Sequence, residues 1–502
     1  TGSLTLAGTG TQTLNGASTY SGGTNLNGGS SVVLGNNAAL GTGTLNVAGA
    51  ATLDTNASLS VNNAVNLGNG STLTLGGSNA LALNGGIAGA GGLVKNGAAT
   101  TTLTGTNTYT GGTTINAGTL AVGAGGSLAA TGAVNLANAG AALDLSGATS
   151  AQTIGALSGV AGTNVNMGGN GLTLGGTASG TFGGAIGGTG SLTLAGTGTQ
   201  TLNGASTYSG GTNLNSGGLV LGNGGALGSG ALNVGGAATL DTNTSLSVNN
   251  AVNLGTGATL TLGGSNALTL SGGIAGAGGL VKDGAATTTL TAANTYTGGT
   301  TINAGTLALG AGGSLAATGA VNVAGVGATF DVSGATGAQT IGALSGVAGA
   351  AVNLGANGLT LSGTASGNFG GTIGGTGGLT VAGTGTQTLS GTNTYTGGTT
   401  INGGSTLALG AGGSLASTGT VDLAGAGATF NLGGASGSQT IGALTGAANT
   451  NVNLGANGLT LSGNGNHAFG GTIGGTGSVT FAGAGTQTLT GANTYTGGTT
   501  IN

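Results

Sequence analysis

The residues that could carry acid–base or metal chemistry are few in this chain. It contains six Asp, two Lys and one His among 502 residues, and it has no Cys. Hydrolysis of a glycosidic bond requires two carboxyl groups that flank the bond at about 5–9.5 Å. The Asp residues do not cluster: Asp54, Asp144, Asp241 and Asp331 each follow a Tyr by 33–35 residues, as one position repeated along the chain. We therefore expect no catalytic residue, no cofactor and no metal site.

The other titratable positions indicate structural roles. Asn431 stands where the fifth module aligns with those Asp residues, and Asp283 and Asp422 stand where other modules have Asn. Interchange of Asp and Asn is typical of hydrogen bonding in turns rather than of titration. His467 aligns with Gly367, in what we expect to be a variable surface turn.

The composition excludes several classes of protein. Charged residues make up 2% of the chain, and two Lys cannot neutralise a phosphate backbone, so no nucleic-acid partner is expected. Gly accounts for 126 residues, and each costs about 1 kcal/mol relative to Ala in a helix, so a helical protein is excluded. The absence of Cys excludes a disulfide framework. A repetitive β structure remains, and the absence of Pro fits it because Pro cannot donate to a ladder.

All six Tyr lie in one recurring tract. Asn-Thr-Tyr-Thr-Gly-Gly-Thr-Thr-Ile-Asn occurs four times, and the variant Ser-Thr-Tyr-Ser-Gly-Gly-Thr-Asn-Leu-Asn occurs twice. Successive Tyr are 89, 99, 88, 99 and 100 residues apart, and self-similarity of this kind indicates a solenoid. We expect each Tyr to pack at a module corner with its hydroxyl paired, in preference to a carbohydrate-binding role. The residues assigned to this structural motif are Tyr20, Tyr109, Tyr208, Tyr296, Tyr395, Tyr495, Gly111, Gly112, Gly298, Gly299, Gly397 and Gly398.

A finer period lies inside each module. Alternating runs such as Val134-Asn135-Leu136 recur every 7–12 residues between Gly-rich segments, which predicts short strands. Strands this short are stable only when they stack on others. We therefore predict an all-β fold, a right-handed parallel β-helix (β-solenoid) built from tandem modules of about 90–100 residues. The longer modules carry about ten extra residues at 154–163, 341–350 and 441–450, which we expect to form an extra strand and turn.

The repeat also predicts the domain organisation. We expect residues 1–502 to form one continuous repetitive β-helix that is a window of a longer chain. The modules are residues 1–19 (partial), 20–108, 109–207, 208–295, 296–394, 395–494 and 495–502 (partial).

One alignment column of the tract mixes charged and apolar residues. It is occupied by Leu6, Lys95, Leu194, Lys282, Val381 and Phe481. Because Lys is almost never fully buried without a partner, we expect this site to reach water. The simpler interpretation is a half-buried rim position. The functional interpretation is a stripe for lateral contact between copies, in which the apolar residues form part-exposed spots.

The tract resembles the autotransporter-associated β-strand repeat. The resemblance rests on Gly-Thr-Gly-Thr-Gln-Thr-Leu followed by Asn-Thr-Tyr-Thr-Gly-Gly-Thr-Thr-Ile, with six copies at module spacing. It implies a β-helical passenger domain on the surface of a Gram-negative bacterium, secreted across the outer membrane. It also implies an outer-membrane anchor, which we expect outside this segment.

These observations together favour a non-enzymatic, extracellular structural protein. We expect a β-helical fibre or stalk that acts in surface adhesion or as a self-associating, biofilm-type matrix filament. Its partners would be further copies of itself, side by side or end to end, and cell-surface or matrix polysaccharide. Two alternatives remain: a polysaccharide-binding or polysaccharide-active β-helix, which needs paired carboxylates or aromatic residues in a groove, and an ice-binding solenoid, which needs a strictly periodic Thr-x-Thr row.

Overall fold

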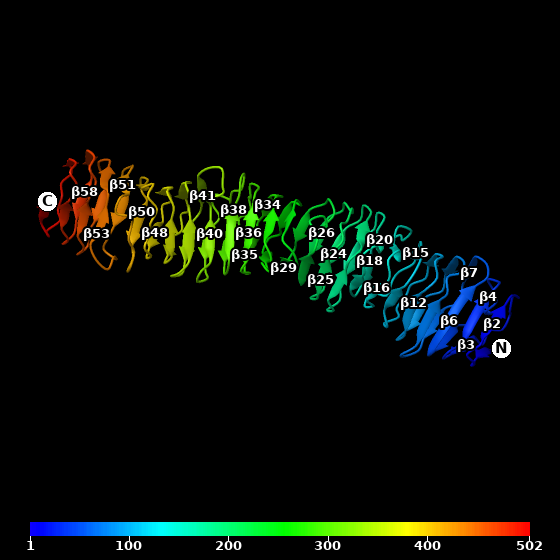
Figure 1. The fold of residues 1–502 in the computed structure, drawn as a ribbon. Helices are drawn as coiled ribbons and strands as arrows, with labels where there is room; N and C mark the ends of the chain where they lie inside the picture. The colour runs from blue at the N-terminus through cyan, green and yellow to red at the C-terminus, as the bar shows by residue number, and fades with distance from the viewer. The chain divides into compact units, whose positions relative to one another are not determined.

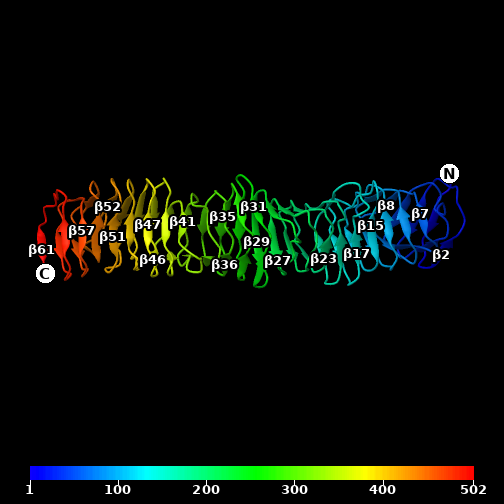
Figure 2. The same cartoon turned by 90° about the horizontal axis from the view of Figure 1, so that it is seen from above.

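A computed structural model describes residues 1–502, and it consists of short strands and turns without any helix. The chain divides into two compact units, Thr1–Leu246 and Ser247–Asn502. In each unit, strands of successive coils lie side by side and pair in parallel (Figures 1 and 2). The predicted all-β solenoid is therefore confirmed.

The strands are three to six residues long throughout. Those of the first unit are β1 (Leu4–Leu6), β2 (Thr11–Leu14), β3 (Thr24–Asn27), β4 (Ser31–Leu34), β5 (Leu45–Ala48), β6 (Ala50–Thr55), β7 (Leu59–Val61), β8 (Val65–Leu67), β9 (Thr72–Leu75), β10 (Leu81–Leu83), β11 (Ile87–Gly89), β12 (Gly92–Lys95), β13 (Thr101–Leu103), β14 (Thr113–Ile115), β15 (Thr119–Val122), β16 (Val134–Leu136), β17 (Ala142–Asp144), β18 (Gln152–Ile154), β19 (Leu157–Gly159), β20 (Asn164–Asn166), β21 (Leu172–Leu174), β22 (Gly180–Phe182), β23 (Ala185–Gly187), β24 (Leu192–Leu194), β25 (Thr199–Leu202), β26 (Thr212–Leu214), β27 (Gly218–Leu221), β28 (Leu232–Val234) and β29 (Ala237–Thr242).

The remaining strands follow the same pattern. They are β30 (Leu246–Val248), which includes the residues on both sides of the division, and, in the second unit, β31 (Val252–Leu254), β32 (Thr259–Leu262), β33 (Leu268–Leu270), β34 (Ile274–Gly276), β35 (Gly279–Lys282), β36 (Thr287–Leu290), β37 (Thr300–Ile302), β38 (Thr306–Leu309), β39 (Val321–Val323), β40 (Thr329–Asp331), β41 (Gln339–Ile341), β42 (Leu344–Gly346), β43 (Ala351–Asn353), β44 (Leu359–Leu361), β45 (Gly367–Phe369), β46 (Thr372–Gly374), β47 (Leu379–Val381), β48 (Thr386–Leu389), β49 (Thr399–Ile401), β50 (Thr406–Leu409), β51 (Thr420–Leu423), β52 (Thr429–Asn431), β53 (Gln439–Ile441), β54 (Ala443–Gly446), β55 (Asn451–Asn453), β56 (Leu459–Leu461), β57 (His467–Phe469), β58 (Thr472–Gly474), β59 (Val479–Phe481), β60 (Gln487–Leu489) and β61 (Thr499–Ile501).

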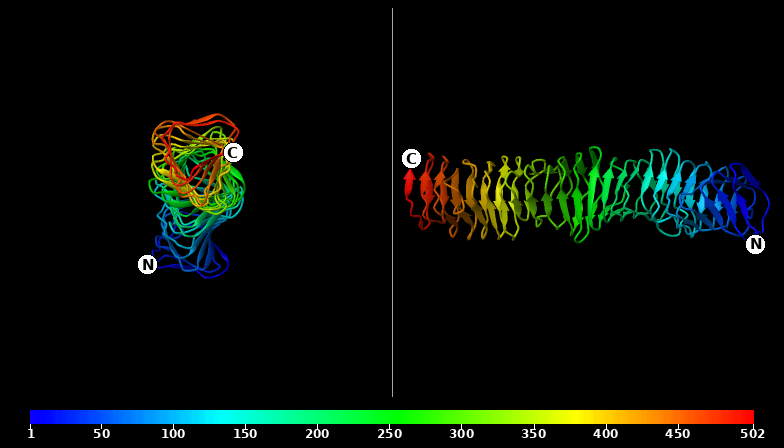
Figure 3. Two further views of the ribbon diagram at one scale, coloured as in Figure 1. Left: turned by 90° about the vertical axis from the view of Figure 1, so that its left-hand side faces the viewer. Right: turned by 90° about the horizontal axis from the view of Figure 1, so that it is seen from below.

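Each coil has three sides and 19–23 residues. Thr101 pairs with Leu120, which sets the shorter length, and Val134 pairs with Leu157, which sets the longer one. The Gly-rich segments between strands form the corners. Because its strands are so short, a single coil cannot shield its own apolar side chains from water. Stacking on the next coil supplies both the ladder hydrogen bonds and the covering layer, and Figure 3 shows these columns of strands in further views.

Alternate residues of each strand point into the coil and form the core. Val32, Leu53 and Leu75 lie in one inward column, pair with one another in sequence, and are fully buried. Full burial of a Leu or Val side chain contributes roughly 1.5–3 kcal/mol. The core is therefore a narrow stack of aliphatic side chains, and the intervening Thr, Asn and Ala residues face outward.

The ten-residue stretch of the longer modules forms a strand and a turn, as predicted. Strand β19 lies within residues 154–163, pairs with β16 below it, and meets β22 above it. The turn closes through Thr163, whose hydroxyl donates to the carbonyl oxygen of Val160 at 2.7 Å. The long module therefore contains one more strand and corner than the short module, and its individual coils keep three sides.

The added strand changes where the next tract lies. In the first, short module, the column that starts at β2 runs through β4, β6 and β9 to β12. The second strand of one tract thus shares a column with the first strand of the next. In the following long module the column from β12 runs through β14, β16, β19 and β22 to β25, so the order is reversed. Module length therefore decides which face of the coil carries a tract.

Candidate functional site

Four of the six Tyr side chains of the tract lie inside the coils, and Tyr20 and Tyr495, near the two ends of the chain, are half-buried. Tyr109 and Tyr208 have no exposed surface, and Tyr296 and Tyr395 are 2% exposed. Each hydroxyl is paired with the Thr four residues later, at 2.5 Å from Tyr109 to Thr113. Burial raises the pKa of Tyr109 to about 12, although the Thr113 hydrogen bond lowers it in part. A side chain so placed anchors a corner and cannot stack on a sugar ring.

The Gly pair after each Tyr allows close stacking of the corner. A Cβ on Gly111 would lie 2.5 Å from the carbonyl carbon of Gly91, which is closer than such contacts occur. Its neighbour Gly112 has a φ of 80°, in the left-handed region that glycine adopts without strain. The second tract pair, Gly298 and Gly299, repeats both features. The pair therefore has a steric role in the stacking of the corner.

The column that was expected to reach water lies in the interior, so that prediction is wrong. Lys95 and Lys282 have no exposed surface, and Leu194 and Val381 are 3% and 2% exposed. Lys95 pairs with Leu75 below and Ile115 above, both in the inward aliphatic column. The remaining members of the column, Leu6 and Phe481, are half-buried. A lateral contact stripe cannot be built from side chains that face the core.

The buried Lys amines find their partners in the corner of the coil. The Lys95 amine donates to the carbonyl oxygen of Gly97 and, at 3.3 Å, to that of Ala117 in the next coil. Lys282 repeats this arrangement with the carbonyl oxygens of Gly284 and Ala304. Burial lowers the pKa of Lys95, and attraction by the Asp54 carboxylate partly offsets that effect. Pairing with carbonyl oxygens explains why Lys is tolerated in an apolar column.

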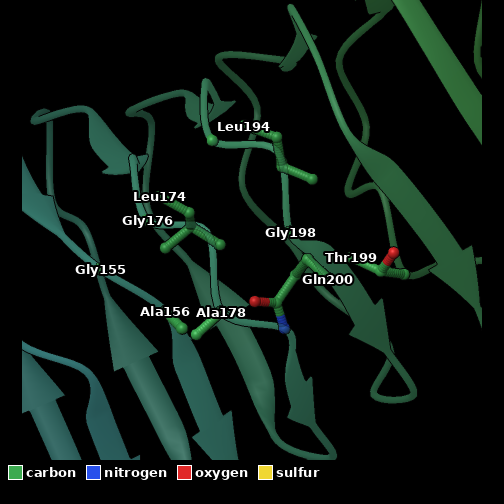
Figure 4. Close-up of a pocket in the computed structure, with 10 residues that line it drawn as sticks. Gly155, Ala156, Leu174, Gly176, Ala178, Leu194, Gly198, Thr199 and Gln200 are labelled. Atoms are coloured by element: carbon green, nitrogen blue, oxygen red, sulfur yellow. The ribbon is translucent and has the colours of Figure 1, made fainter.

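A glutamine occupies the same corner where the column holds an aliphatic residue. Gln200 donates from Nε2 to the carbonyl oxygen of Leu157, two coils below, at 3.0 Å. Figure 4 shows its amide directed toward Ala156 and Ala178, in the coils below. The cavity left between this amide and Leu194 is about 10 Å³, roughly the space of one water. The corner therefore has no room for a substrate.

The matches to a known repeat coincide with these corners. The model of the passenger-associated-transport repeat matches residues 4–30, 93–122, 192–221, 280–309, 379–409 and 479–502. The chain carries six copies of this repeat. Each copy starts at the strand that bears the Lys or aliphatic residue and includes the Tyr corner, and together they indicate an autotransporter passenger domain, which implies secretion to the cell surface. No curated protein and no solved structure shows significant similarity to the chain.

Between the passenger repeats, Asp and Asn make equivalent hydrogen bonds. Asp331 Oδ1 accepts from the backbone of Ser333 at 2.9 Å and from the amide of Asn353 at 3.1 Å. Asn431 accepts from the corresponding Gly433 and Asn453 at 2.9 and 3.1 Å. Two further sites repeat the exchange: Asp283 with Asn96, and Asp422 with Asn322. The interpretation of these Asp residues as hydrogen-bond acceptors is therefore supported by geometry.

Asp54 shares its position with Asp144, Asp241 and Asp331, as predicted, because each pairs with the third residue of the strand that follows the tract. It lies in β6, two coils below Lys95, and accepts hydrogen bonds from the hydroxyl of Ser78 at 2.7 Å and the backbone of Thr55 at 2.8 Å. Burial raises the pKa of Asp54, but the hydrogen bonds together lower it by more, so the pKa lies below its usual value.

His467 is also placed differently from the prediction. It lies in β57 instead of a surface turn, is half-buried, and pairs with Gln487 of the next coil. The chain has no group of three or more His, Cys, Asp or Glu residues close enough to hold a metal ion. None of its segments forms a helix with the length and hydropathy needed to cross a bilayer.

The outward faces carry hydroxyl rows of limited length. Thr11, Ser31, Thr52 and Thr74 pair in succession, and so do Thr340, Thr360, Thr380 and Thr400, a row that ends at Asp422. The outward row beside the first of these passes from Thr13 to Val33 and Asp54, so it does not continue as Thr. An ice-binding face needs both rows of a Thr-x-Thr array, so this arrangement does not favour that alternative.

Proposed function

We propose that this passenger segment is a non-enzymatic structural element, which displays or forms a filament in surface adhesion or in an extracellular matrix. The observation that carries the proposal is the equivalence of Asp and Asn at three sites, because an acceptor that needs no negative charge does no acid–base chemistry. The passenger repeat and the solenoid fold suggest the same structural role.

The mechanism would be collective. Each coil is joined to the next by ladder hydrogen bonds and by a continuous aliphatic stack, so load is spread over many weak interactions. A formal net charge of −4 over 502 residues provides little repulsion between copies, and we infer that they associate laterally or end to end. We place the segment outside a Gram-negative bacterium, with its outer-membrane anchor in another part of the protein.

The experiment compares cells that display the segment with cells that display a passenger of similar length without these repeats. Adhesion to abiotic surfaces and to other cells should rise with display, and electron microscopy should show filamentous or bundled material. Display without any change in adhesion or matrix would contradict the proposal. Turnover of a polysaccharide by the purified segment would contradict the non-enzymatic part of it.

A second candidate, polysaccharide binding, is favoured by one surface hollow. This hollow of about 470 Å³ lies beside the Tyr109 corner, and its lining includes Thr106, Thr108, Ser127 and Thr131. Their hydroxyls suit a glycan, although the lining has no aromatic residue to stack on a sugar. Binding of the purified segment to a glycan array, and its loss in Thr106→Val/Thr108→Val, would identify this function. Binding to no glycan would leave the structural role.

A further inference from the structure

Two core positions of the passenger repeat change together. They are six residues apart, and they occur in only two combinations: Lys with Thr, or an aliphatic or aromatic residue with Gln. The Lys–Thr combinations are Lys95 with Thr101 and Lys282 with Thr288, and the others are Leu6 with Gln12, Leu194 with Gln200, Val381 with Gln387, and Phe481 with Gln487. Both positions face inward, so the exchange concerns the core and not the surface.

A third position, in the coil below, follows the same division. Thr101 and Thr288 pair with Leu81 and Leu268, whereas Gln200 and Gln387 pair with glycines. The reason is steric: a Cβ on Gly180 would lie 2.3 Å from the carbonyl oxygen of Leu157 and 2.9 Å from Oε1 of Gln200. The longer Gln side chain thus needs an empty position beneath it, and the shorter Thr is accompanied by a Leu that fills the space. In the last repeat Gln487 has His467 beneath it.

The hydrogen bond of the Gln side chain connects this corner to module length. Nε2 of Gln200, Gln387 and Gln487 donates at 3.0 Å to the carbonyl oxygens of Leu157, Leu344 and Leu444, respectively. All three acceptors lie in the ten-residue stretch that only the long modules have. Both Lys–Thr repeats follow short modules, which lack the stretch, and their amines donate to carbonyl oxygens of the repeat's own corner and the next coil.

We propose that these three positions form a length code. Lys–Thr–Leu closes a short module, and Leu or Val with Gln and Gly closes a long one, with Phe481, Gln487 and His467 in these places in the last repeat. In the short combination the Lys amines are paired, whereas the hydroxyls of Thr101 and Thr288 are buried without a partner. The Gln amide finds its acceptor only in a long module, because this acceptor does not exist in a short module and loses its amide partner when Lys–Thr follows a long one. Such a penalty distinguishes correct from incorrect stacking, which is the form that specificity takes when partners are otherwise alike.

The need for such a code arises from the repeats themselves. Residues 1–27 and 189–215 are identical, so a folding chain could stack a tract on the wrong module. Misassembly between similar units is a characteristic failure of repeat proteins. A stacking error by one side of a coil would also move the tract to another face, because module length sets the column of strands in which each tract lies. The code goes beyond the proposed function and holds whatever the filament binds.

The test exchanges complete combinations between modules. The triple variant Leu81→Gly/Lys95→Leu/Thr101→Gln places the long-module residues after a short module, and Gly180→Leu/Leu194→Lys/Gln200→Thr does the reverse. Both combinations occur in the native chain, but a Cβ at position 180 would lie 2.3 Å from the Leu157 carbonyl oxygen, so the double variant Leu194→Lys/Gln200→Thr is measured beside the second triple to separate that clash from the lost hydrogen bond. The length code predicts that each variant lowers the melting temperature of the segment by several degrees, roughly 2–4 °C for each kcal/mol lost.

Two further variants keep the result interpretable. Leu194→Val stays within the residue types that long modules use and should leave the melting temperature within about 2 °C. Gln200→Thr alone should lower it, because the Leu157 carbonyl oxygen then has no amide partner. If either triple variant melts within about 2 °C of the native segment, the length code is wrong. If the first triple or the double variant does not fold at all while Leu194→Val does, the code is supported.

Discussion

At the scale of single residues, two Lys amines lie within an apolar column. Each is stabilised by carbonyl oxygens of corner residues, some from its own turn and some from the next coil. Whether a Lys at this position reaches water depends on residues about 20 positions away, which the local sequence does not contain. This is why a rule that holds for most Lys residues gave the wrong side of the coil here.

The burial of both Lys residues leads to a prediction about proteolysis. The chain has no Arg, and neither Lys is accessible, so trypsin should cut the folded segment only when the coil around Lys95 or Lys282 opens. Cleavage by trypsin should therefore be negligible under native conditions and should rise with denaturant along the unfolding curve measured by circular dichroism. An unstructured peptide spanning Lys95 is the control and should be cut at once. Rapid native cleavage at Lys95 would show that the corner is open.

The buried Tyr residues predict alkaline unfolding. Their pKa values are raised in the folded chain, to about 12 for Tyr109 and Tyr208, so their contribution is complete below about pH 10 and is lost as the pH rises through 12. Two pKa units correspond to about 3 kcal/mol for each side chain. Absorbance of the phenolate should therefore appear together with loss of β signal, and not before it. In Tyr109→Phe/Tyr208→Phe the unfolding pH should rise, although stability at neutral pH falls because two Thr hydroxyls lose their partner. Phenolate formation in a fully folded chain would contradict this assignment.

At the scale of elements, corners decide the fold more than strands do. The strands are short and similar, and any aliphatic–polar alternation would pair in parallel. The Gly residues of the corners set how closely coils approach, since Gly298 lies where a Cβ would be 2.5 Å from the carbonyl oxygen of Gly278. The sequence predicts these corners through its Gly-Gly pairs, but it does not separate glycines needed for space from glycines needed for a positive φ.

Three substitutions in the second unit separate the two roles. Gly298→Ala should destabilise by roughly 3 kcal/mol, as overpacking of a rigid core does. Gly327→Ala, with a φ of 79° and no atom within 4 Å of the added Cβ, should cost about 1–2 kcal/mol for the left-handed conformation alone. Gly337→Ala, which has neither constraint, should lie within about 0.5 kcal/mol of the native segment. Denaturant melts of the three variants give the order, and equal costs would mean that close approach has no effect.

The sequence predicts the β-solenoid, its coil-sized period and the strand in the ten-residue stretch, because all three depend on patterns within a few residues. It does not predict the alternation of faces, since that requires the sides of several coils to be counted together. The association of Lys95 with Thr101, and of Leu194 with Gln200, is a correlated change between the aligned tracts. Its cause lies 43 residues away from Gln200, in the carbonyl oxygen of Leu157 that accepts the amide hydrogen bond, so neighbouring residues do not reveal it.

At the scale of the whole molecule, the near absence of charge shapes the thermodynamics. The repeat predicts that all 502 residues form one continuous solenoid, and this stays a prediction. The stability of each unit can be considered separately. Few groups link folding to pH. Asp54 contributes stability that is present above its unfolded pKa near 3.9 and is lost as the pH falls, because its folded pKa is lowered. Lys95, with a lowered pKa, favours the folded chain most above about pH 10.5 and less as the pH falls below it.

These signs predict a broad plateau of stability between about pH 4 and 9. Acid should remove the contribution of Asp54 below the plateau, and the Tyr residues should end it on the alkaline side. Salt should also have little effect, because ladder hydrogen bonds and aliphatic burial are not screened and charged residues make up only 2% of the chain. Thermal melts across this range, at low salt and at about 1 M salt, should differ by less than about 10 °C. A larger shift within the plateau would mean that Lys95 or Asp54 titrates there, and in that case Lys95→Leu/Thr101→Gln should flatten the profile even as it lowers the melting temperature.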